Sequence, residues 1–301
     1  MICPNHLLKN WLEEDFPDFS DKLYPLCLNG AGTEPIFFSH PLFAQRSARL
    51  AASDLFHDRV HRAYVYLASY YFCVDAIIDD HARSGTYGEA PGQIATFLGP
   101  LLSASTHLFS LAVKEQFPGK EADVLEDLRE LLRENAIGLL TEKRFKEQPL
   151  AARTDEEKDN VVGRANLFIF IFRYYWTLSN NCNLYPLISY LREFVFLMQL
   201  GDDLGDWRAD FRAGRWTSFL RECFGVLDRI PIEQELEEFV YLSGAYERRL
   251  ARVINGFSEI IDVFTRVGQN DLASYISFER DAALDGLREF TRVKVELGVA
   301  T

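Results

Sequence analysis

Apolar residues recur at helical spacing along almost all of the chain after residue 40, and this pattern limits the fold more than any other feature. Glycine and proline, which end helices, are gathered into short clusters such as residues 85–92 and 118–119. No convincing strand pattern is present. We therefore expect one all-α domain over residues 1–301, with an irregular N-terminal segment at 1–40. The expected helices are 45–82, 93–117, 122–147, 156–179, 187–212, 232–267 and 272–297.

Residues 167–176, with the sequence LFIFIFRYYW, are apolar on every side of a helix. Such a helix has to be surrounded by other helices. It is either a plain core helix or one whose aromatic face lines a cavity, and the segment itself favours neither. The longest apolar run, residues 167–172, is too short to cross a bilayer, which needs about 20 residues. We expect no stable membrane insertion.

Composition excludes several classes of protein. The formal net charge of −13 argues against a nucleic-acid partner, which would need clustered basic residues, but it does not argue against metal cations. The five cysteines lie at least 24 positions apart, so neither a zinc motif nor a disulfide framework is indicated. The N-terminus lacks a basic stretch followed by an apolar one, so no signal peptide is evident. We expect a cytoplasmic protein.

A first carboxylate cluster lies within residues 73–85, CVDAIIDDHARSG. On a helix Asp75 and Asp79 stack at i and i+4, with Asp80 beside them. Like charges at this spacing destabilise a helix. Because the preceding stretch is strongly apolar, these carboxylates predict a neutralising cation.

A second cluster, MQLGDDLGDWRAD at residues 198–210, also follows an apolar helix. Asp202, Asp206 and Asp210 would share one helix face, and Asp203 neighbours Asp206. Arginines follow at once. Hard carboxylate oxygens next to arginines suit a Mg²⁺–phosphate site. Antiparallel packing of the two helices would place both clusters face to face across the mouth of a bundle.

Each cluster also has alternative interpretations. Either one alone could be an acidic helix end that meets solvent. A calcium-binding EF-hand is excluded because no loop alternates Asp or Asn around a central glycine. His57, His61 and His81 could suggest a histidine–aspartate metallohydrolase, but the first two fall in or beside a charged stretch, HDR, at 57–59.

Residues 199–206, QLGDDLGD, resemble the second aspartate-rich motif of trans-prenyltransferases. The first cluster resembles their first motif, with Ala76 in place of one aspartate. Extended to the Gly-Arg at 214–215, the second cluster is also similar to the DxxxD and Gly-Arg of squalene and phytoene synthases. These families share the class I isoprenoid synthase fold. The close matches cover residues 60–86 and 191–217.

Departures from these families narrow the reaction that the resemblance implies. Nothing within residues 29–49 matches the GGKxxR motif that binds isopentenyl diphosphate in chain-elongating enzymes. A chain with the ionising motifs but without this site resembles a terpene cyclase. The usual Asn-Ser-Glu second motif of cyclases is replaced here by an acidic one, so a condensing enzyme stays an alternative.

The resemblance implies a single-domain helical bundle around an aromatic-lined cavity and a Mg²⁺-dependent cyclase with three metal ions. The implied metal ligands are Asp75, Asp79, Asp80, Asp202, Asp203 and Asp206, with Asp210 as an alternative to Asp202. The implied diphosphate-binding arginines are Arg83, Arg164, Arg173, Arg208 and Arg215. The groups expected to drive ionisation are Asp75, Asp79, Asp203 and Arg173. The implied pocket lining is Tyr64, Leu67, Tyr71, Phe168, Phe172, Tyr175, Val195, Met198 and Gln199.

The expected substrate is farnesyl or geranylgeranyl diphosphate, and a homodimer would be usual in the resembled families. Three other classes stay open. A trans-prenyltransferase or a squalene- or phytoene-synthase-like enzyme would need a second substrate. An all-α Mg²⁺-dependent nucleotide pyrophosphatase would need a polar base pocket. A non-catalytic helical interaction protein would not need carboxylates stacked against apolar helices.

Overall fold

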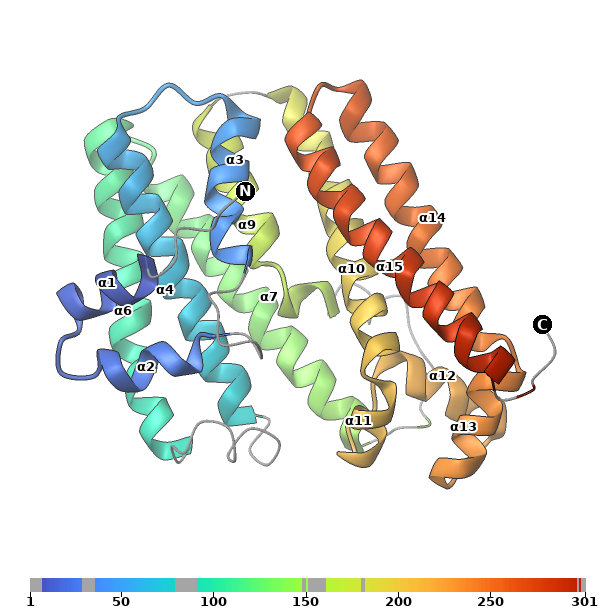
Figure 1. Ribbon diagram of the computed structural model, residues 1–301. Coiled ribbons are helices and arrows are strands. Elements are labelled where there is room, and N and C mark those ends of the chain that lie inside the picture. Colours follow the sequence, from blue (N-terminus) through green and yellow to red (C-terminus); the bar gives the residue numbers. More distant parts are fainter. Residues whose placement is uncertain are drawn as a thin grey trace. The chain divides into compact units, whose positions relative to one another are not determined.

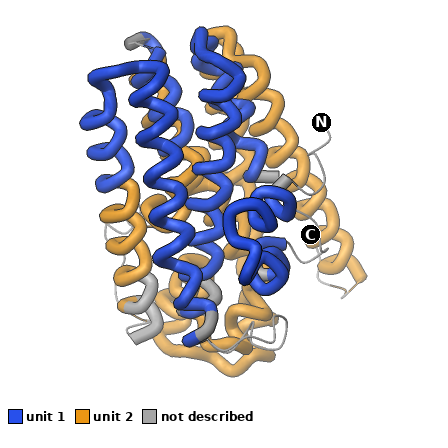
Figure 2. The backbone as a smooth tube through the Cα atoms, turned by 90° about the vertical axis from the view of Figure 1, so that its left-hand side faces the viewer, with its two compact units in different colours: residues 1–130, 170–183 blue, residues 131–169, 184–301 orange. Residues whose placement is uncertain are grey.

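The computed structural model describes residues 7–28, 36–78, 91–147, 150, 161–179, 182–296 and 298. These residues are largely helical and include no β-strand, which confirms the all-α prediction for this part of the chain (Figure 1). They fall into two compact units, residues 1–130 with 170–183 and residues 131–169 with 184–301 (Figure 2). The division runs through two helices, α7 (Glu121–Glu147) and α9 (Leu167–Leu178), and the single domain stays a prediction.

The first unit is built around α4 (Asp54–Ile78) and α6 (Pro91–Gln116). Ser53 caps the N-terminus of α4, since its Oγ accepts a hydrogen bond from the Phe56 N–H at 3.2 Å. Ser105 of α6 donates to the Ala63 carbonyl at 2.8 Å and joins the pair in its buried core. The other elements of this unit include α1 (Leu7–Asp15), α2 (Ser20–Leu26), η1 (Ile36–Ser39) and α3 (His40–Ala48).

The expectation that residues 1–40 are irregular is wrong for two stretches, because α1 and α2 are helical. Helices this short are marginal alone and need tertiary packing. Trp11, Leu12 and Leu23 supply it, because all three are buried. The helix expected at 45–82 is also interrupted, because Arg49 ends α3 with a left-handed backbone, φ 49°.

One described helix is long and apolar enough to cross a membrane, judged by length and composition alone. It comprises Ile94–Gln116 of α6, and 28% of its apolar window is buried. Core helices of soluble proteins meet the same criterion, and α6 packs on α4, where Ser105 donates to the Ala63 carbonyl. The absence of membrane insertion stays a prediction.

Three histidines join other elements of the first unit to α4. His40 Nδ1 lies 2.9 Å from the Tyr64 hydroxyl, His57 Nδ1 lies 3.1 Å from the Tyr175 hydroxyl, and His61 Nε2 lies 2.7 Å from the Phe38 carbonyl. Burial lowers the pKa of all three imidazoles, that of His40 to about 3. At neutral pH these histidines are therefore uncharged.

Acidification is expected to destabilise the protein through His40. Between pH 6.5 and about 3 the unfolded chain holds a proton on His40 that the folded chain lacks. The free energy of unfolding should then fall by about 1.4 kcal/mol per pH unit below 6.5, or about 2 kcal/mol by pH 5. Urea denaturation at several pH values measures this slope. His40→Gln should flatten it and the exposed His107→Gln should not; equal slopes in both variants would refute the assignment.

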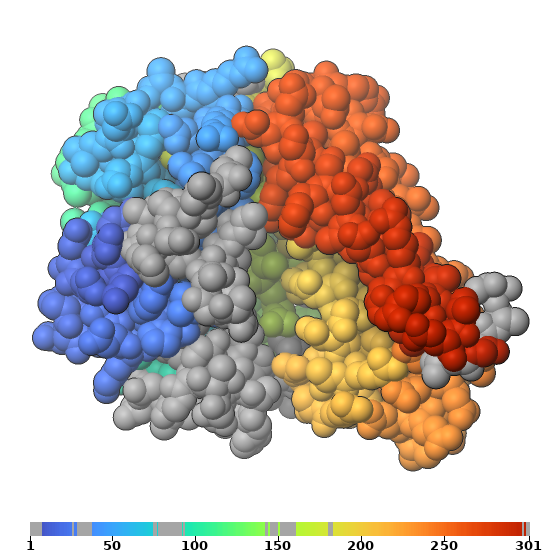
Figure 3. All heavy atoms as spheres, in the orientation of Figure 1, coloured from blue at the N-terminus to red at the C-terminus, as the bar shows by residue number. Residues whose placement is uncertain are grey.

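The second unit surrounds α10 (Ile188–Gly205), which packs against α12 (Ser218–Leu227), α14 (Ala245–Arg266) and α15 (Asn270–Glu296). Helix α14 approaches α10 closely at Gly256, where an added Cβ would lie 2.5 Å from Leu197 Cδ1. Helix α15 presents one long side to solvent, coloured red in Figure 3. The second unit also includes the C-terminal part of α7 and the last residues of η2 (Cys182–Leu187), which directly precedes α10.

Two expected helices of this unit are split. The one at 187–212 ends at Gly205, and α11 (Trp207–Arg212) follows. The one at 232–267 is divided into α13 (Glu233–Leu242) and α14 by Gly244, whose φ of 69° suits glycine. A lone glycine inside a helical pattern is often tolerated, so the pattern did not mark this break.

Candidate functional site

The second carboxylate cluster lies at the C-terminal end of α10. The preceding turns of this helix are apolar and buried, including Leu191, Phe194 and Leu197. Asp202 and Asp203 lie in its last turn, and Asp206 is the junction to α11. The prediction that acidic residues end a buried helix is confirmed here.

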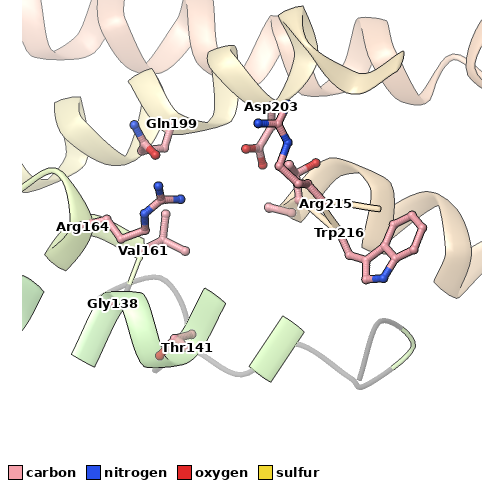
Figure 4. A pocket seen from close by; sticks show the side chains of 10 residues that line it. Gly138, Thr141, Val161, Arg164, Gln199, Asp203, Arg215 and Trp216 are labelled. Carbon is pink, nitrogen blue, oxygen red and sulfur yellow. The ribbon is translucent and has the colours of Figure 1, made fainter. Parts of the chain in front are cut away.

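Gln199 and Asp203 line a pocket of the second unit together with Arg164 and Arg215 (Figure 4). Figure 4 shows the Arg164 guanidinium beneath Gln199 and the Arg215 side chain beside Asp203. The cavity volume is about 60 Å³, room for about two water molecules. The pocket thus suits a small group such as one phosphate and is too small for a prenyl chain. The remaining lining residues are Gly138, Thr141, Val161, Trp216, Thr217 and Ser218.

Arg215 is held in the pocket wall by Asp210. Its Nη2 lies 2.8 Å from Asp210 Oδ1, and its backbone N–H donates to the Asp210 carbonyl at 2.8 Å. Asp210 is buried, whereas Asp202 and Asp206 reach solvent. Helix α10 ends before Asp206 and the chain continues as α11, so a single helix face shared by these three aspartates stays a prediction.

Arg164 is placed by a short segment that packs against α7. Asn135 of α7 donates to the Arg164 carbonyl at 3.2 Å, and Asn166 donates to the Leu131 carbonyl at 3.1 Å. Gly163 permits the approach, since an added Cβ would lie 2.5 Å from the Glu134 carbonyl oxygen. The segment around Arg164 therefore depends on a backbone contact that only glycine allows.

Asp202 lies apart from this pocket, near α15. Its side chain reaches solvent, yet the surrounding protein and the charge of Asp206 raise the pKa of its carboxyl group to about 6. Burial and the charge of Asp202 likewise raise the pKa of Glu279, which accepts a hydrogen bond from the Tyr275 hydroxyl. No group of three or more metal-ligating side chains is close enough to hold a metal ion within the part of the chain that the structure describes.

Two other predicted arginines have partners away from the pocket. Arg173 belongs to the first unit and forms an ion pair with Asp127. Arg208 donates to Glu237 at 2.7 Å and to the Tyr241 hydroxyl at 2.6 Å. Neither lines the pocket formed by Arg164 and Arg215. Their role in diphosphate binding stays a prediction.

Most of the first carboxylate cluster lies outside the described residues. Asp79, Asp80 and Arg83 fall in this undescribed stretch. Asp75 belongs to α4 in the first unit, and nothing is described of its side chain. That the two clusters face one another stays a prediction.

Of the residues expected to line a substrate cavity, Gln199 lines the pocket. Tyr71 and Met198 are half-buried, and the others are buried: Tyr64, Leu67, Phe168, Phe172, Tyr175 and Val195. Aromatic contacts hold several of these rings. Phe168 lies 5.3 Å from Phe194 between ring centroids, and Phe172 lies 5.6 Å from Trp176. Core packing accounts for these contacts, and contact with a carbocation stays a prediction.

Arg249 of α14 was not predicted as a site residue from the sequence, yet its Nη2 lies 3.8 Å from Asp203 Oδ2. A signal for it was present in the sequence. Arg249 stands on the apolar stripe of α14, between Tyr246 and Val253, where a charge needs partners.

No protein-family model matches this chain and no curated protein is significantly similar to it, so functional inference rests on the residues themselves.

Proposed function

We infer that the protein is a class I terpene synthase, which ionises farnesyl or geranylgeranyl diphosphate with Mg²⁺, releases pyrophosphate and guides the carbocation to a terpene. One observation carries the proposal. Arg164 and Arg215, from segments far apart in sequence, line one pocket with Gln199 and Asp203 of the acidic motif. Arginine donors beside carboxylates suit a diphosphate with bound cations.

The carboxylates of α10 fit divalent cations in their chemistry. Asp202 and Asp206 offer oxygen ligands, and a cation would offset the burial and the charge of Asp206 that raise the pKa of Asp202. Asp203 faces Arg249 and lines the pocket, whereas Asp202 and Asp206 carry the solvent-exposed carboxylates of this motif. Two carboxylates are too few for a site, and the other ligands would come from Asp75, Asp79 and Asp80 or from the diphosphate. Mg²⁺ would stabilise the negative charge of the leaving group.

The chain's own residues then have separate tasks. Arg215 and Arg164 donate hydrogen bonds to the leaving diphosphate, and Asp210 keeps Arg215 in place beforehand. The allylic cation that remains needs walls that hold back water. Buried aromatic rings can stabilise it by up to about 2 kcal/mol each through cation–π attraction. Because the volume of the pocket is small, the prenyl chain would lie outside it.

Product analysis tests this proposal. The purified protein is incubated with geranyl, farnesyl and geranylgeranyl diphosphate, with and without Mg²⁺ and isopentenyl diphosphate. We expect a hydrocarbon or terpene alcohol from a single diphosphate, only with Mg²⁺. Longer diphosphates or a head-to-head product would show a condensing enzyme instead. Hydrolysis of nucleoside triphosphates without turnover of any prenyl diphosphate would show a pyrophosphatase.

A further inference from the structure

Arg249 is a buried arginine that contacts two residues of the pocket wall, Ser218 and Asp203. Its side chain is 4% exposed and lies in the apolar stripe of α14. A guanidinium this deep is costly unless carboxylates and hydrogen-bond acceptors surround it. The polar groups around the Arg249 guanidinium therefore indicate which parts of the structure it connects.

All its polar partners belong to α12 and α10. Nη1 donates to Glu222 Oε2, and Nη2 donates to Ser218 Oγ in the first turn of α12. The same Nη2 lies 3.8 Å from Asp203 Oδ2, a charge contact without a hydrogen bond. One side chain thus joins α14 to the beginning of α12 and to the acidic motif of α10.

Two of these partners, Ser218 and Asp203, line the pocket, while Arg249 does not. Ser218 directly follows Arg215, Trp216 and Thr217, which form the same wall. Thr217, the N-cap residue of α12, makes no capping hydrogen bond through its side chain. The position of this wall relative to Asp203 therefore depends on the contacts of Arg249.

We propose that Arg249 is a positioning residue of the pocket. It holds the first turn of α12 against Asp203, so that an oxyanion of the phosphate or diphosphate class meets donors already in place. The identity of the anion rests on the proposed function, whereas the positioning of α12 does not. A neutral side chain at position 249 would remove the cation that the Asp203 carboxylate of α10 and the Glu222 carboxylate of α12 share.

The test compares Arg249→Gln and Arg249→Lys with Arg248→Gln, which removes the same charge from the exposed neighbouring position. The first measurement is hydrogen exchange of backbone amides, which reports local opening. Arg249→Gln should accelerate exchange in residues 215–222 and leave α4 unchanged. The second is calorimetric binding of inorganic pyrophosphate, which should weaken at least about tenfold because the donors lose their alignment. Arg249→Lys should restore part of both.

Unchanged exchange in residues 215–222 of Arg249→Gln would overturn the proposal. So would faster exchange throughout the protein in both Arg249 variants, since that would show a general structural role. If the wild-type protein binds no pyrophosphate, the proposed function fails, and the exchange of residues 215–222 still decides the role of Arg249. Equal pyrophosphate affinity in Arg249→Gln and Arg248→Gln would also contradict it.

Discussion

Arg215→Gln is expected to lower kcat/KM for a prenyl diphosphate by about 100-fold to 1000-fold, the usual cost of losing one fixed donor to a developing anion. The reason for this expectation is the geometry of Arg215. Both its backbone and its guanidinium are held by Asp210, at 2.8 Å in each contact. The donor is therefore in place before substrate arrives, and glutamine would lose both its charge and its reach.

Arg212→Gln is the matched control for this prediction. Arg212 lies three positions earlier, is 63% exposed and pairs with Glu233. Its replacement removes the same charge without touching the pocket, so kcat/KM should stay within about twofold. Steady-state kinetics and a thermal unfolding midpoint measured on both variants separate a catalytic loss from a folding defect. Similar kinetics in Arg215→Gln and wild type would remove Arg215 from the diphosphate site.

Gly163→Ala is expected to reduce the free energy of unfolding by about 1 to 3 kcal/mol, the usual cost of overpacking. The new Cβ would lie 2.5 Å from the Glu134 carbonyl oxygen and 3.1 Å from its carbon. These are backbone atoms of α7, so they cannot turn away as a flexible side chain would. The segment has to shift, and Arg164 shifts with it, so kcat/KM should fall as well.

Gly286→Ala in α15 provides the comparison, since nothing lies within 4 Å of the added Cβ. There alanine should stabilise the helix by up to about 1 kcal/mol through its higher helix propensity. Urea denaturation of both variants measures the difference. A Gly163→Ala protein as stable as Gly286→Ala would show that the segment around Arg164 does not rest on α7 as described.

Long amphipathic helices were predictable because their apolar periodicity extends over many turns. The expected ranges 93–117 and 122–147 nearly coincide with α6 and α7. Short helices were not, since α1 and α2 are stabilised by the burial of their own side chains, such as Trp11, in tertiary packing that a local pattern does not reveal. Breaks at Asp206 and Gly244 also escaped notice, because each interrupts an otherwise continuous helical pattern.

The candidate site shows the same division between local and distant information. The acidic motif on α10 and Arg215 stand close together in sequence, and their spacing identified them. Ser218 and Arg249 join the site through packing of α12 and α14, which no local motif encodes. An arginine within an apolar stripe is the kind of signal that marks such residues, because a buried charge has to meet a partner.

The proposed function depends on one step, the Mg²⁺-dependent ionisation of a prenyl diphosphate. Release of inorganic pyrophosphate from farnesyl and geranylgeranyl diphosphate, followed with and without Mg²⁺ in the absence of any second substrate, tests it most directly. Pyrophosphate should be released from at least one of the two substrates with Mg²⁺, and from neither when the metal is chelated. No release from either substrate at any Mg²⁺ concentration would contradict it.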